Sequence, residues 1–321
     1  MINLEEKHVI NLIENFYGLK INQSQVILLS SSFAKSYKII NPIATIVVKV
    51  FSEEYKTKKD ALSELKLLLE LSSNNVKVII PKSGVNRDFI LELNQIQNGY
   101  FAIAYEYFEG EVIPKLNKVQ SFNLGVNLAN FHKFSINPNL ELDKTEYTIG
   151  YLFDDSYKLI RPFLGDSQKE YLNKLRDKIQ LQLELINLEI NNENYGICHG
   201  DYISRNSLWK NEKECLTIDF EFVSRGYRAY DMSHFKWELV YCKYEKTYTD
   251  NIWEEFLKGY NSIRVIQDNE NKMINISMLL YHIFMAGERV KLSKVLGEHL
   301  LAKQFWDRCM EFLYENEKDI L

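Results

Sequence analysis

The sequence predicts an α+β protein of two lobes, the first mainly an antiparallel sheet with a helix and the second mainly helical. Two observations support this fold class. The first 105 residues contain short apolar runs rich in β-branched residues, bounded by turn signals such as Pro81 and Asn98-Gly99. From about residue 115 onward, apolar residues recur at helical spacing. We therefore expect two lobes, one within residues 1–105 and one within residues 111–321.

The N-terminal elements follow from the spacing of apolar residues. Residues 4–17 form an amphipathic helix pattern that Gly18 ends, and residues 56–71 form a second one. Between and after them lie the strand-like runs. These are Val26–Leu29, Tyr37–Ile40, Ala44–Phe51, Val76–Ile80, Phe89–Leu93 and Tyr100–Tyr105.

The C-terminal lobe is expected to contain several helices. Phe122, Val126 and Ala129 share one helical stripe, and residues 151–190 are helical with a break around Pro162 and Gly165. Residues 137–150 are polar and irregular. The remaining helices are predicted at 232–245, 249–260, 272–287 and 291–317.

The composition is that of a globular protein with enough apolar residues for two lobes. The 321 residues are 46% hydrophobic, and the net charge of −5 with no basic face argues against a nucleic-acid partner. The longest apolar run, Met278–Ala286, is too short to span a bilayer, and residues 1–7 lack the layout of a signal peptide. The four cysteines show no paired spacing, so we expect reduced thiols in a cytoplasmic protein. The sequence indicates no oligomeric state.

One motif carries the chemistry. Residues 199–206 read H-G-D-x-x-x-x-N, and Asp219 follows in an apolar run as D-F-E. Phosphoryl transfer needs a carboxylate that orients the acceptor hydroxyl and takes its proton, a role that fits Asp201. It also needs oxygen ligands for Mg²⁺ on the nucleotide phosphates, a role that fits Asn206 and Asp219.

The spacing of the motif predicts how its two metal-binding residues meet. The segments Ser207–Trp209 and Leu216–Phe220 are predicted to form two strands around a turn at Lys210–Glu214. Such a hairpin brings Asn206 and Asp219 side by side.

These residues resemble the motifs of the aminoglycoside phosphotransferase and choline kinase-like family. That family typically carries H-G-D where protein kinases carry H-R-D, and D-[FW]-[ED] where they carry D-F-G, as at His199–Asp201 and Asp219–Glu221 here. The resemblance implies a protein-kinase-like fold, ATP and Mg²⁺ as cofactors, and a small hydroxylated molecule as acceptor. GTP in place of ATP is not excluded.

By the same resemblance, Lys49 contacts the α- and β-phosphates of the nucleotide and pairs with Glu64 of the following helix. Burying a lysine in a β-branched run is costly unless it is paired. The alternative is a strand-edge Lys49 in water and a Glu64 on a solvated helix face.

The resemblance also assigns two further nucleotide contacts. The turn at 30–36 covers the phosphates, but it contains serines where the family commonly has glycines, so Ser31 and Ser32 would supply the contacts. By the same resemblance, residues 106–110 are the hinge between the lobes, and the backbone from Glu106 to Phe108 would bind the adenine edge. Alternatively, a strand simply ends at Gly110.

Other residues in the matched region are interpreted as structural. By the same resemblance, His132 is expected to be a packing and hydrogen-bonding residue, and Asp231 a brace for the catalytic loop. Asp154, Asp155 and Glu238 are candidate carboxylates for a cationic substrate, although a solvated surface position is the simpler interpretation of each.

The sequence therefore predicts transfer of the ATP γ-phosphoryl group to an alcohol group of an aminoglycoside-like antibiotic or a metabolite such as an amino alcohol, homoserine or sugar. The alternatives are a catalytically weak or inactive nucleotide-binding module and an unrelated helical binding protein. A protein Ser/Thr kinase is disfavoured, because only eleven residues separate Asp219 from Asp231 and no A-P-E motif follows.

Overall fold

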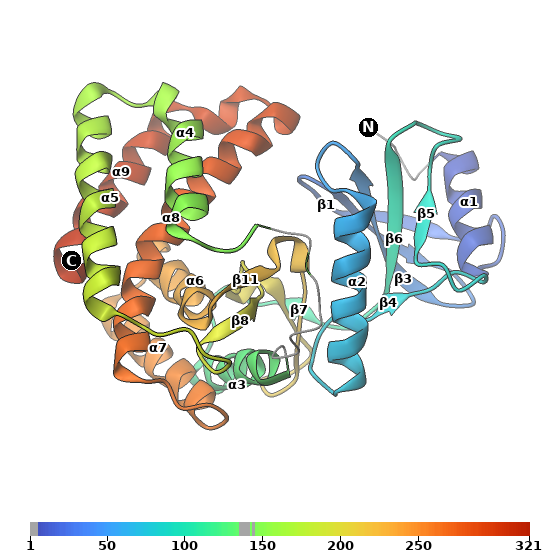
Figure 1. Cartoon of the computed structure of the whole chain (residues 1–321). Coiled ribbons are helices and arrows are strands. Elements are labelled where there is room, and N and C mark those ends of the chain that lie inside the picture. Colours follow the sequence, from blue (N-terminus) through green and yellow to red (C-terminus); the bar gives the residue numbers. More distant parts are fainter. Residues whose placement is uncertain (1–5, 135–141, 143–144) are drawn as a thin grey trace. The chain divides into compact units, whose positions relative to one another are not determined.

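The computed structural model describes residues 6–134, 142 and 145–321. The chain divides into two compact units, the first mainly within residues 1–109 and the second mainly within 110–321. Figure 1 draws both, and each is described by itself below. Within the described residues, no helix is both long and apolar enough to cross a membrane.

The first unit is a six-stranded antiparallel sheet with two helices, which confirms the fold class expected for this lobe. The strand order is β1-β2-β3-β6-β4, and β5 also pairs with β6. The strands are β1 Gln25–Ser31, β2 Lys35–Ile40, β3 Thr45–Ser52, β4 Pro81–Lys82, β5 Ile90–Glu92 and β6 Tyr100–Glu106, and the helices are α1 Lys7–Tyr17 and α2 Lys58–Ser73.

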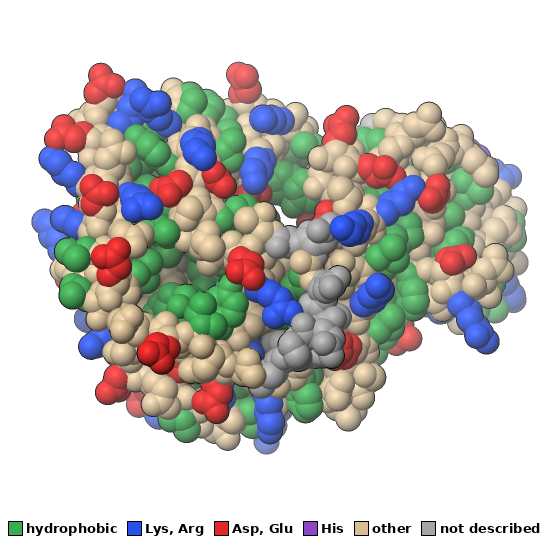
Figure 2. Space-filling view, in the orientation of Figure 1, with side chains coloured by type: hydrophobic (Ala, Val, Ile, Leu, Met, Phe, Trp, Pro, Cys, Tyr) green, Lys and Arg blue, Asp and Glu red, His purple; other side chains and the backbone are tan. Residues whose placement is uncertain are grey.

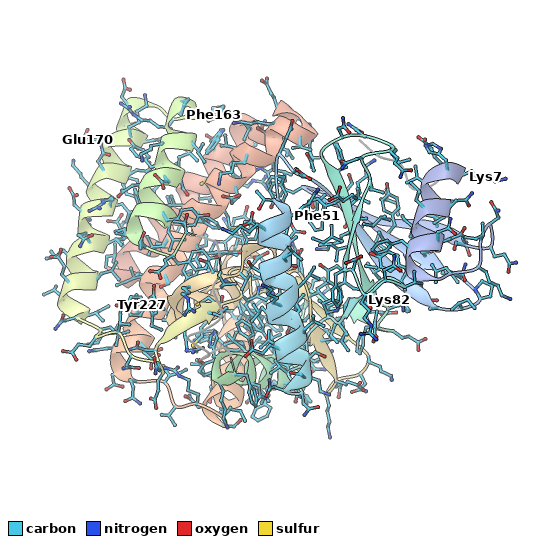
Figure 3. All side chains as sticks on the ribbon, turned by 45° about the vertical axis from the view of Figure 1, so that its right-hand side comes forward. Lys7, Phe51, Lys82, Phe163, Glu170 and Tyr227 are labelled. Carbon is cyan, nitrogen blue, oxygen red and sulfur yellow. The ribbon has the colours of Figure 1, made fainter. Side chains whose placement is uncertain are left out.

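The alternation of side chains along β3 sorts them to the two faces of this sheet. Val48 and Val50 are buried in one core cluster with Val9 and Ile13 of α1. Lys49 therefore points to the opposite face. Phe51, which shares that face and is labelled in Figure 3, stacks on Phe101 with ring centroids 5.5 Å apart.

One predicted strand is absent. Residues 76–80 contain only an isolated bridge at Val78, and the paired segment begins at Pro81. Val76 and Val78 are nevertheless buried, so their alternation reflects packing without a continuous ladder. Pro81 is tolerated as the first residue of a strand, where its missing N–H disturbs the ladder least.

The second unit combines helices with two small sheets, ordered β10-β9-β7 and β11-β8. The helices are α3 Lys118–Phe134, α4 Ser156–Ile160, α5 Asp166–Ile186, α6 Arg228–Tyr241, α7 Lys246–Asn261, α8 Asp268–Leu296 and α9 Lys303–Ile320. A π-helical turn covers Gly150–Asp155, and 3-10 turns cover Arg161–Phe163, Ser204–Asn206, Phe220–Phe222 and Glu298–Leu301. The strands are β7 Glu111–Val112, β8 Tyr195–Cys198, β9 Ser207–Trp209, β10 Cys215–Thr217 and β11 Ser224–Tyr227.

The sequence predicted correctly that this lobe is mainly helical, but some of the predicted helix ends are wrong. The break expected between residues 287 and 291 is wrong, because α8 runs unbroken from Asp268 to Leu296. It ends at Gly297, whose φ of 107° favours glycine. Of the segment predicted to be irregular, residues 137–141 and 143–144 lie outside the described residues.

The core of the second unit forms around α8, which is apolar on most of its circumference. Met278, Leu279, Ile283 and Phe284 are buried among residues of the neighbouring helices and loops. At the surface, Figure 2 shows Lys and Arg side chains interspersed with Asp and Glu on the face in view.

Candidate active site

The H-G-D segment follows β8 directly, and its glycine is required by the backbone. Gly200 has a φ of +85°, which L side chains rarely adopt. A Cβ there would also overlap the Phe222 carbonyl oxygen and the Tyr147 hydroxyl. The hydroxyl of Tyr147 donates a hydrogen bond to that same carbonyl. Gly200 thus lets the loop pass directly against the segment that follows Asp219.

Asp231 of α6 holds the start of this loop. Its two carboxylate oxygens accept the backbone N–H groups of His199 at 2.6 Å and Gly200 at 2.8 Å. Burial raises the pKa of the Asp231 carboxyl to about 7, and the two backbone donors oppose that rise. The prediction that Asp231 braces the catalytic loop is confirmed.

His132 of α3 extends the same network. Its Nε2 lies 3.0 Å from Asp231 Oδ2, and its Nδ1 lies 2.7 Å from the hydroxyl of Tyr260. Burial lowers the pKa of His132 well below its usual value, so the ring is neutral. The neutral ring donates to Asp231 from Nε2 and accepts from Tyr260 at Nδ1. The structural role expected for His132 is confirmed.

Two further side chains of α6 support the rest of the loop. His234 Nδ1 accepts the N–H of Tyr202 at 3.1 Å, and Glu238 Oε2 accepts the N–H of Ser204 at 2.7 Å. His234 and Glu238 follow Asp231 at helical spacing, so one face of α6 binds successive residues of the loop. Glu238 is 3% exposed, so a solvated position for it is wrong. Its contact is with the loop backbone.

Asp201 is partly buried, and each of its carboxylate oxygens accepts a hydrogen bond. Asn206 Nδ2 donates to Oδ2 at 2.8 Å, and the hydroxyl of Tyr281 donates to Oδ1. Burial raises the pKa of Asp201 to about 7, helped by the negative charges of Asp219 and Glu238 and opposed by the two hydrogen bonds. A carboxylate with a pKa near neutrality is suited to general base work.

The predicted hairpin is confirmed. Strands β9 and β10 pair antiparallel, and beyond their last pair the N–H of Ile218 donates to the carbonyl of Asn206 at 2.9 Å. The second strand is shorter than expected and ends at Thr217. Asp219 lies beyond it with a φ of 68°, a left-handed conformation that aspartate tolerates better than most residues.

The donor set at this end of the hairpin fits a hard cation. The amide nitrogen of Asn206 is committed to Asp201, so its Oδ1 is the atom that a cation would contact. Asp219, the residue directly after Ile218, offers its carboxylate oxygens. Oxygen ligands of this kind suit Mg²⁺. The metal-binding roles of Asn206 and Asp219 stay predictions.

A second cluster has atoms at metal-ligand spacing but is better explained as a hydrogen-bond network. His132, Cys198 and Asp231 are all buried, with ligand atoms within 4.8 Å of one another. His132 and Asp231 bind each other and the loop, as described above. Burial raises the pKa of the Cys198 thiol well above its usual value, so it stays protonated.

In the first unit, Glu64 has a partner that the sequence did not suggest. It is 3% exposed, forms an ion pair with Lys56 and accepts a hydrogen bond from the Tyr105 hydroxyl at 3.3 Å. The alternative of a solvated Glu64 is therefore wrong. Lys49 lies on the sheet face opposite α1, partly buried. Its pairing with Glu64 stays a prediction.

The serine-rich turn is tighter than predicted. Strand β1 continues to Ser31 and β2 begins at Lys35, so the turn itself comprises residues 32–34. Phe33 at its tip stacks on Tyr55, with ring centroids 4.0 Å apart and planes 4° from parallel. Ser31 and Ser32 are exposed, and their contact with phosphate stays a prediction.

The segment predicted to bind adenine lies at the end of β6. The N–H of Glu106 donates to the carbonyl of Ile80 at 2.9 Å, so this amide is used within the first unit. Phe108 follows the end of the strand, and the division between the units falls after Glu109. Adenine binding at Glu106 and Phe108 stays a prediction.

The remaining candidate carboxylates form surface ion pairs. Asp154 accepts two hydrogen bonds from Arg176, at 3.1 and 3.2 Å, and Asp155 pairs with Lys158 at 2.7 Å.

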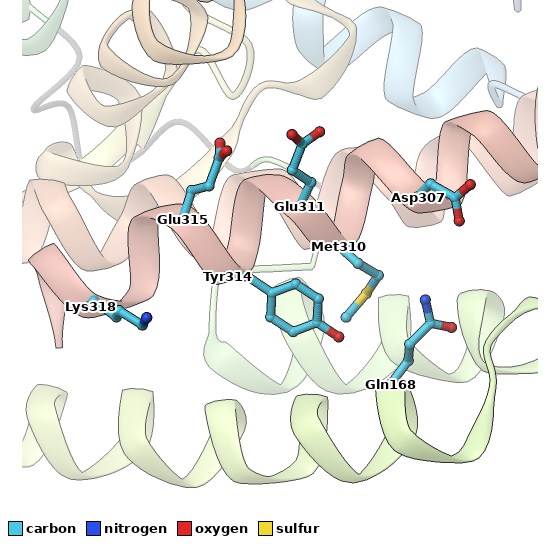
Figure 4. A pocket seen from close by; sticks show the side chains of 7 residues that line it. All are labelled: Gln168, Asp307, Met310, Glu311, Tyr314, Glu315 and Lys318. Atoms are coloured by element: carbon cyan, nitrogen blue, oxygen red, sulfur yellow. The ribbon is translucent and has the colours of Figure 1, made fainter.

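Figure 4 shows a shallow pocket between α5 and α9 that contains none of the predicted site residues. Its acidic residues include Asp307 and Glu311, which pair with Lys303 and Lys243. We assign it no part in catalysis.

The sheet unit, the helical unit and the loop that holds Asp201 define the class of kinase-like phosphotransferases. A family model described as the phosphotransferase enzyme family matches residues 27–264, and the chain belongs to this family.

The chain is also similar to individual proteins of this class. An uncharacterized protein of Synechocystis sp. is 26% identical over 251 residues, which are 77% of this chain and 68% of that protein. A solved amicoumacin kinase in complex with AMP-PNP, Ca²⁺ and Ami superposes with a TM-score of 0.80 at 18% identity, covering 98% of this chain and 94% of that one. A microcompartment-associated aminopropanol kinase gives a TM-score of 0.76 at 16% identity, covering 96% and 94%.

Proposed function

We propose that this protein transfers the γ-phosphoryl group of ATP to a hydroxyl of a small molecule. The observation that carries the proposal is the state of Asp201. Its carboxylate is oriented by two donors and lies on a loop held by successive residues of α6, and burial raises its pKa to about 7.

In the proposed reaction, Asp201 accepts the proton of the acceptor hydroxyl as the oxygen attacks the γ-phosphorus. The bond between the γ-phosphorus and the β,γ-bridging oxygen breaks, and ADP leaves. Asn206 and Asp219 would hold Mg²⁺, which neutralises charge on the phosphates when bound. The protein contributes mainly position and charge, as is usual for this reaction.

We assign nucleotide binding to the first unit. Lys49 would contact the α- and β-phosphates with support from Glu64, and Ser31 and Ser32 would approach the phosphates from the turn. Backbone groups near Glu106 and Phe108 would bind adenine. Glu64 is buried with Lys56 as its ion-pair partner, and Lys49 would be a second cation on the same carboxylate.

The acceptor is proposed to be an amino alcohol or a hydroxylated antibiotic. The similar solved proteins are named for amicoumacin and aminopropanol. The test is a coupled assay of ADP release over a panel of aminopropanol, ethanolamine, choline, homoserine, sugars, aminoglycosides and amicoumacin. Mass spectrometry would then detect the phosphorylated product, and GTP would be compared with ATP.

The expected result is ADP release that depends on one acceptor class and is lost in Asp201→Asn. Tight binding of Mg·ATP with no turnover would instead support an inactive nucleotide-binding module, which the glycine-free turn favours. Failure to bind Mg·ATP at all would refute both.

A further inference from the structure

Tyr281 lies in the middle of α8, in a part of the chain where the sequence shows no recognisable motif. It is fully buried. Its hydroxyl donates a hydrogen bond to Asp201 Oδ1, eighty positions earlier in the sequence. Buried tyrosine hydroxyls usually have a hydrogen-bond partner, and here the partner is the carboxylate that we propose as the base.

The ring of Tyr281 is fixed by side chains of α6. It stacks on His234, with ring centroids 4.0 Å apart and planes 29° from parallel, and meets Trp237 edge-on at 5.1 Å. His234 also accepts the N–H of Tyr202 in the catalytic loop. One histidine therefore supports both the loop and the tyrosine, so the hydroxyl and Asp201 are held in one frame.

The hydroxyl is placed to orient Asp201 and not to replace it. With Asn206 on Oδ2 and Tyr281 on Oδ1, rotation of the carboxylate would break one hydrogen bond or both. An ionised carboxylate can accept about four hydrogen bonds, so room remains for an acceptor hydroxyl. Burial also raises the pKa of Tyr281 well above its usual value, so it acts as a donor only.

We propose that Tyr281 is a positioning residue, whose hydroxyl holds the Asp201 carboxylate in the orientation that receives the proton of the acceptor. This inference rests on the proposed function, since it acts through Asp201. It gives α8 a part in orienting the proposed base and a physical reason for the buried Tyr281 hydroxyl.

The test compares two tyrosine-to-phenylalanine variants. Tyr281→Phe keeps the ring and its stacking and removes only the hydroxyl. Tyr230→Phe is the matched control, because Tyr230 is also buried, its ring lies 6.2 Å from that of Tyr281, and its hydroxyl has no hydrogen-bond partner among the described residues. Both variants are assayed with Mg·ATP, using the panel acceptor with the fastest turnover and, separately, water.

Tyr281→Phe is expected to lower kcat by about ten-fold, well short of the ~10²- to 10⁴-fold loss typical of removing a general base. The KM for ATP should change by less than about two-fold, because the hydroxyl acts through Asp201 and not through the nucleotide. Tyr230→Phe should match the wild type. In an Asp201→Asn background, Tyr281→Phe should have no further effect, because its target carboxylate is gone.

A kcat for Tyr281→Phe equal to that of Tyr230→Phe would overturn the inference while the proposed function stands. So would an equal loss of kcat with and without the Asp201 carboxylate, which would show that the hydroxyl acts elsewhere. A wild-type protein that turns over ATP neither with any acceptor of the panel nor with water would overturn the proposed function and this inference together.

Discussion

Lowering the pH from 7 to 5 is expected to destabilise the helical unit through His282 of α8. This ring is buried, with Nδ1 accepting the indole N–H of Trp237 at 3.0 Å and Nε2 donating to the carbonyl of Cys309 at 3.0 Å. It also stacks on Phe312 at 4.2 Å. These partners suit the neutral ring, because a proton on Nδ1 would face the donor of Trp237. Burial lowers the pKa of His282 to about 4.

The size and sign of the effect follow from this pKa. An unfolded histidine titrates near about 6.5, so folding lowers the pKa by about 2.5 units, equivalent to about 3.4 kcal/mol. The folded state resists protonation, so the stability is present above the unfolded pKa of about 6.5 and is lost as the pH falls toward about 4. At pH 5, about 2 kcal/mol of the free energy of unfolding should be gone.

The assay is urea unfolding at pH 7 and pH 5 for the wild type and His282→Gln. Glutamine cannot titrate, yet it retains an amide that can both accept and donate. All four tryptophans lie within residues 209–306, so tryptophan fluorescence reports on the helical unit. Burial lowers the pKa values of His132 and His234 as well, and they act in the same direction, so the variant is needed to isolate His282.

We expect the wild type to lose about 2 kcal/mol more than His282→Gln between pH 7 and pH 5. Equal losses in the two proteins would refute the argument, since they would show that His282 is not held neutral by its surroundings.

Three further predictions concern the candidate site. Asp201→Asn should lower kcat by ~10² to 10⁴ with nucleotide affinity within a few-fold, and a variant that keeps more than a tenth of the wild-type kcat would exclude the role. Asp219→Asn should lose the gain in nucleotide affinity that Mg²⁺ brings, and asparagine is chosen because it tolerates the left-handed backbone at this position. Nucleotide titrations with and without Mg²⁺ test this prediction. Lys49→Ala should raise KM for ATP and lower kcat, and Glu64→Ala should do so less. A double variant whose loss equals the sum of the two single losses would show that Glu64 does not support Lys49.

The sequence predicted correctly those parts of the structure that depend on residues close together in the chain. The antiparallel sheet and the hairpin after Asn206 follow from alternation and turn residues, and the structure contains both. The prediction of a strand at 76–80 was wrong, because alternating valines can be buried without forming the hydrogen bonds of a sheet. Ion pairing was harder to predict. Glu64 was matched to Lys49 by resemblance, and that pairing stays a prediction. The ion pair that Glu64 forms with Lys56, eight residues before it, was not predicted.

The support of the catalytic loop was only partly predictable. Asp231 was recognised by resemblance, but His234 and Glu238 carry no motif of their own and are identified only by the direction of one face of α6. Tyr281 could not be found at all, because a tyrosine in a helix that is apolar on most sides is expected to be a core residue. Its function depends on a contact eighty residues away in the sequence, which no periodicity reports.

The H-G-D and D-F-E motifs of the site are joined by hydrogen bonds. His199 Nε2 donates to the carbonyl of Ile218 at 3.0 Å, and the N–H of Ile218 donates to the carbonyl of Asn206.

Gly200 packs against the carbonyl of Phe222, which also accepts the hydroxyl of Tyr147. A side chain at position 200 would push away the 3-10 turn that begins directly after Asp219. Gly200 of the H-G-D motif is therefore needed for the position of the D-F-E segment as well as for the conformation of its own loop. The positions of the proposed base and of the proposed metal ligands are then fixed by the same close contact.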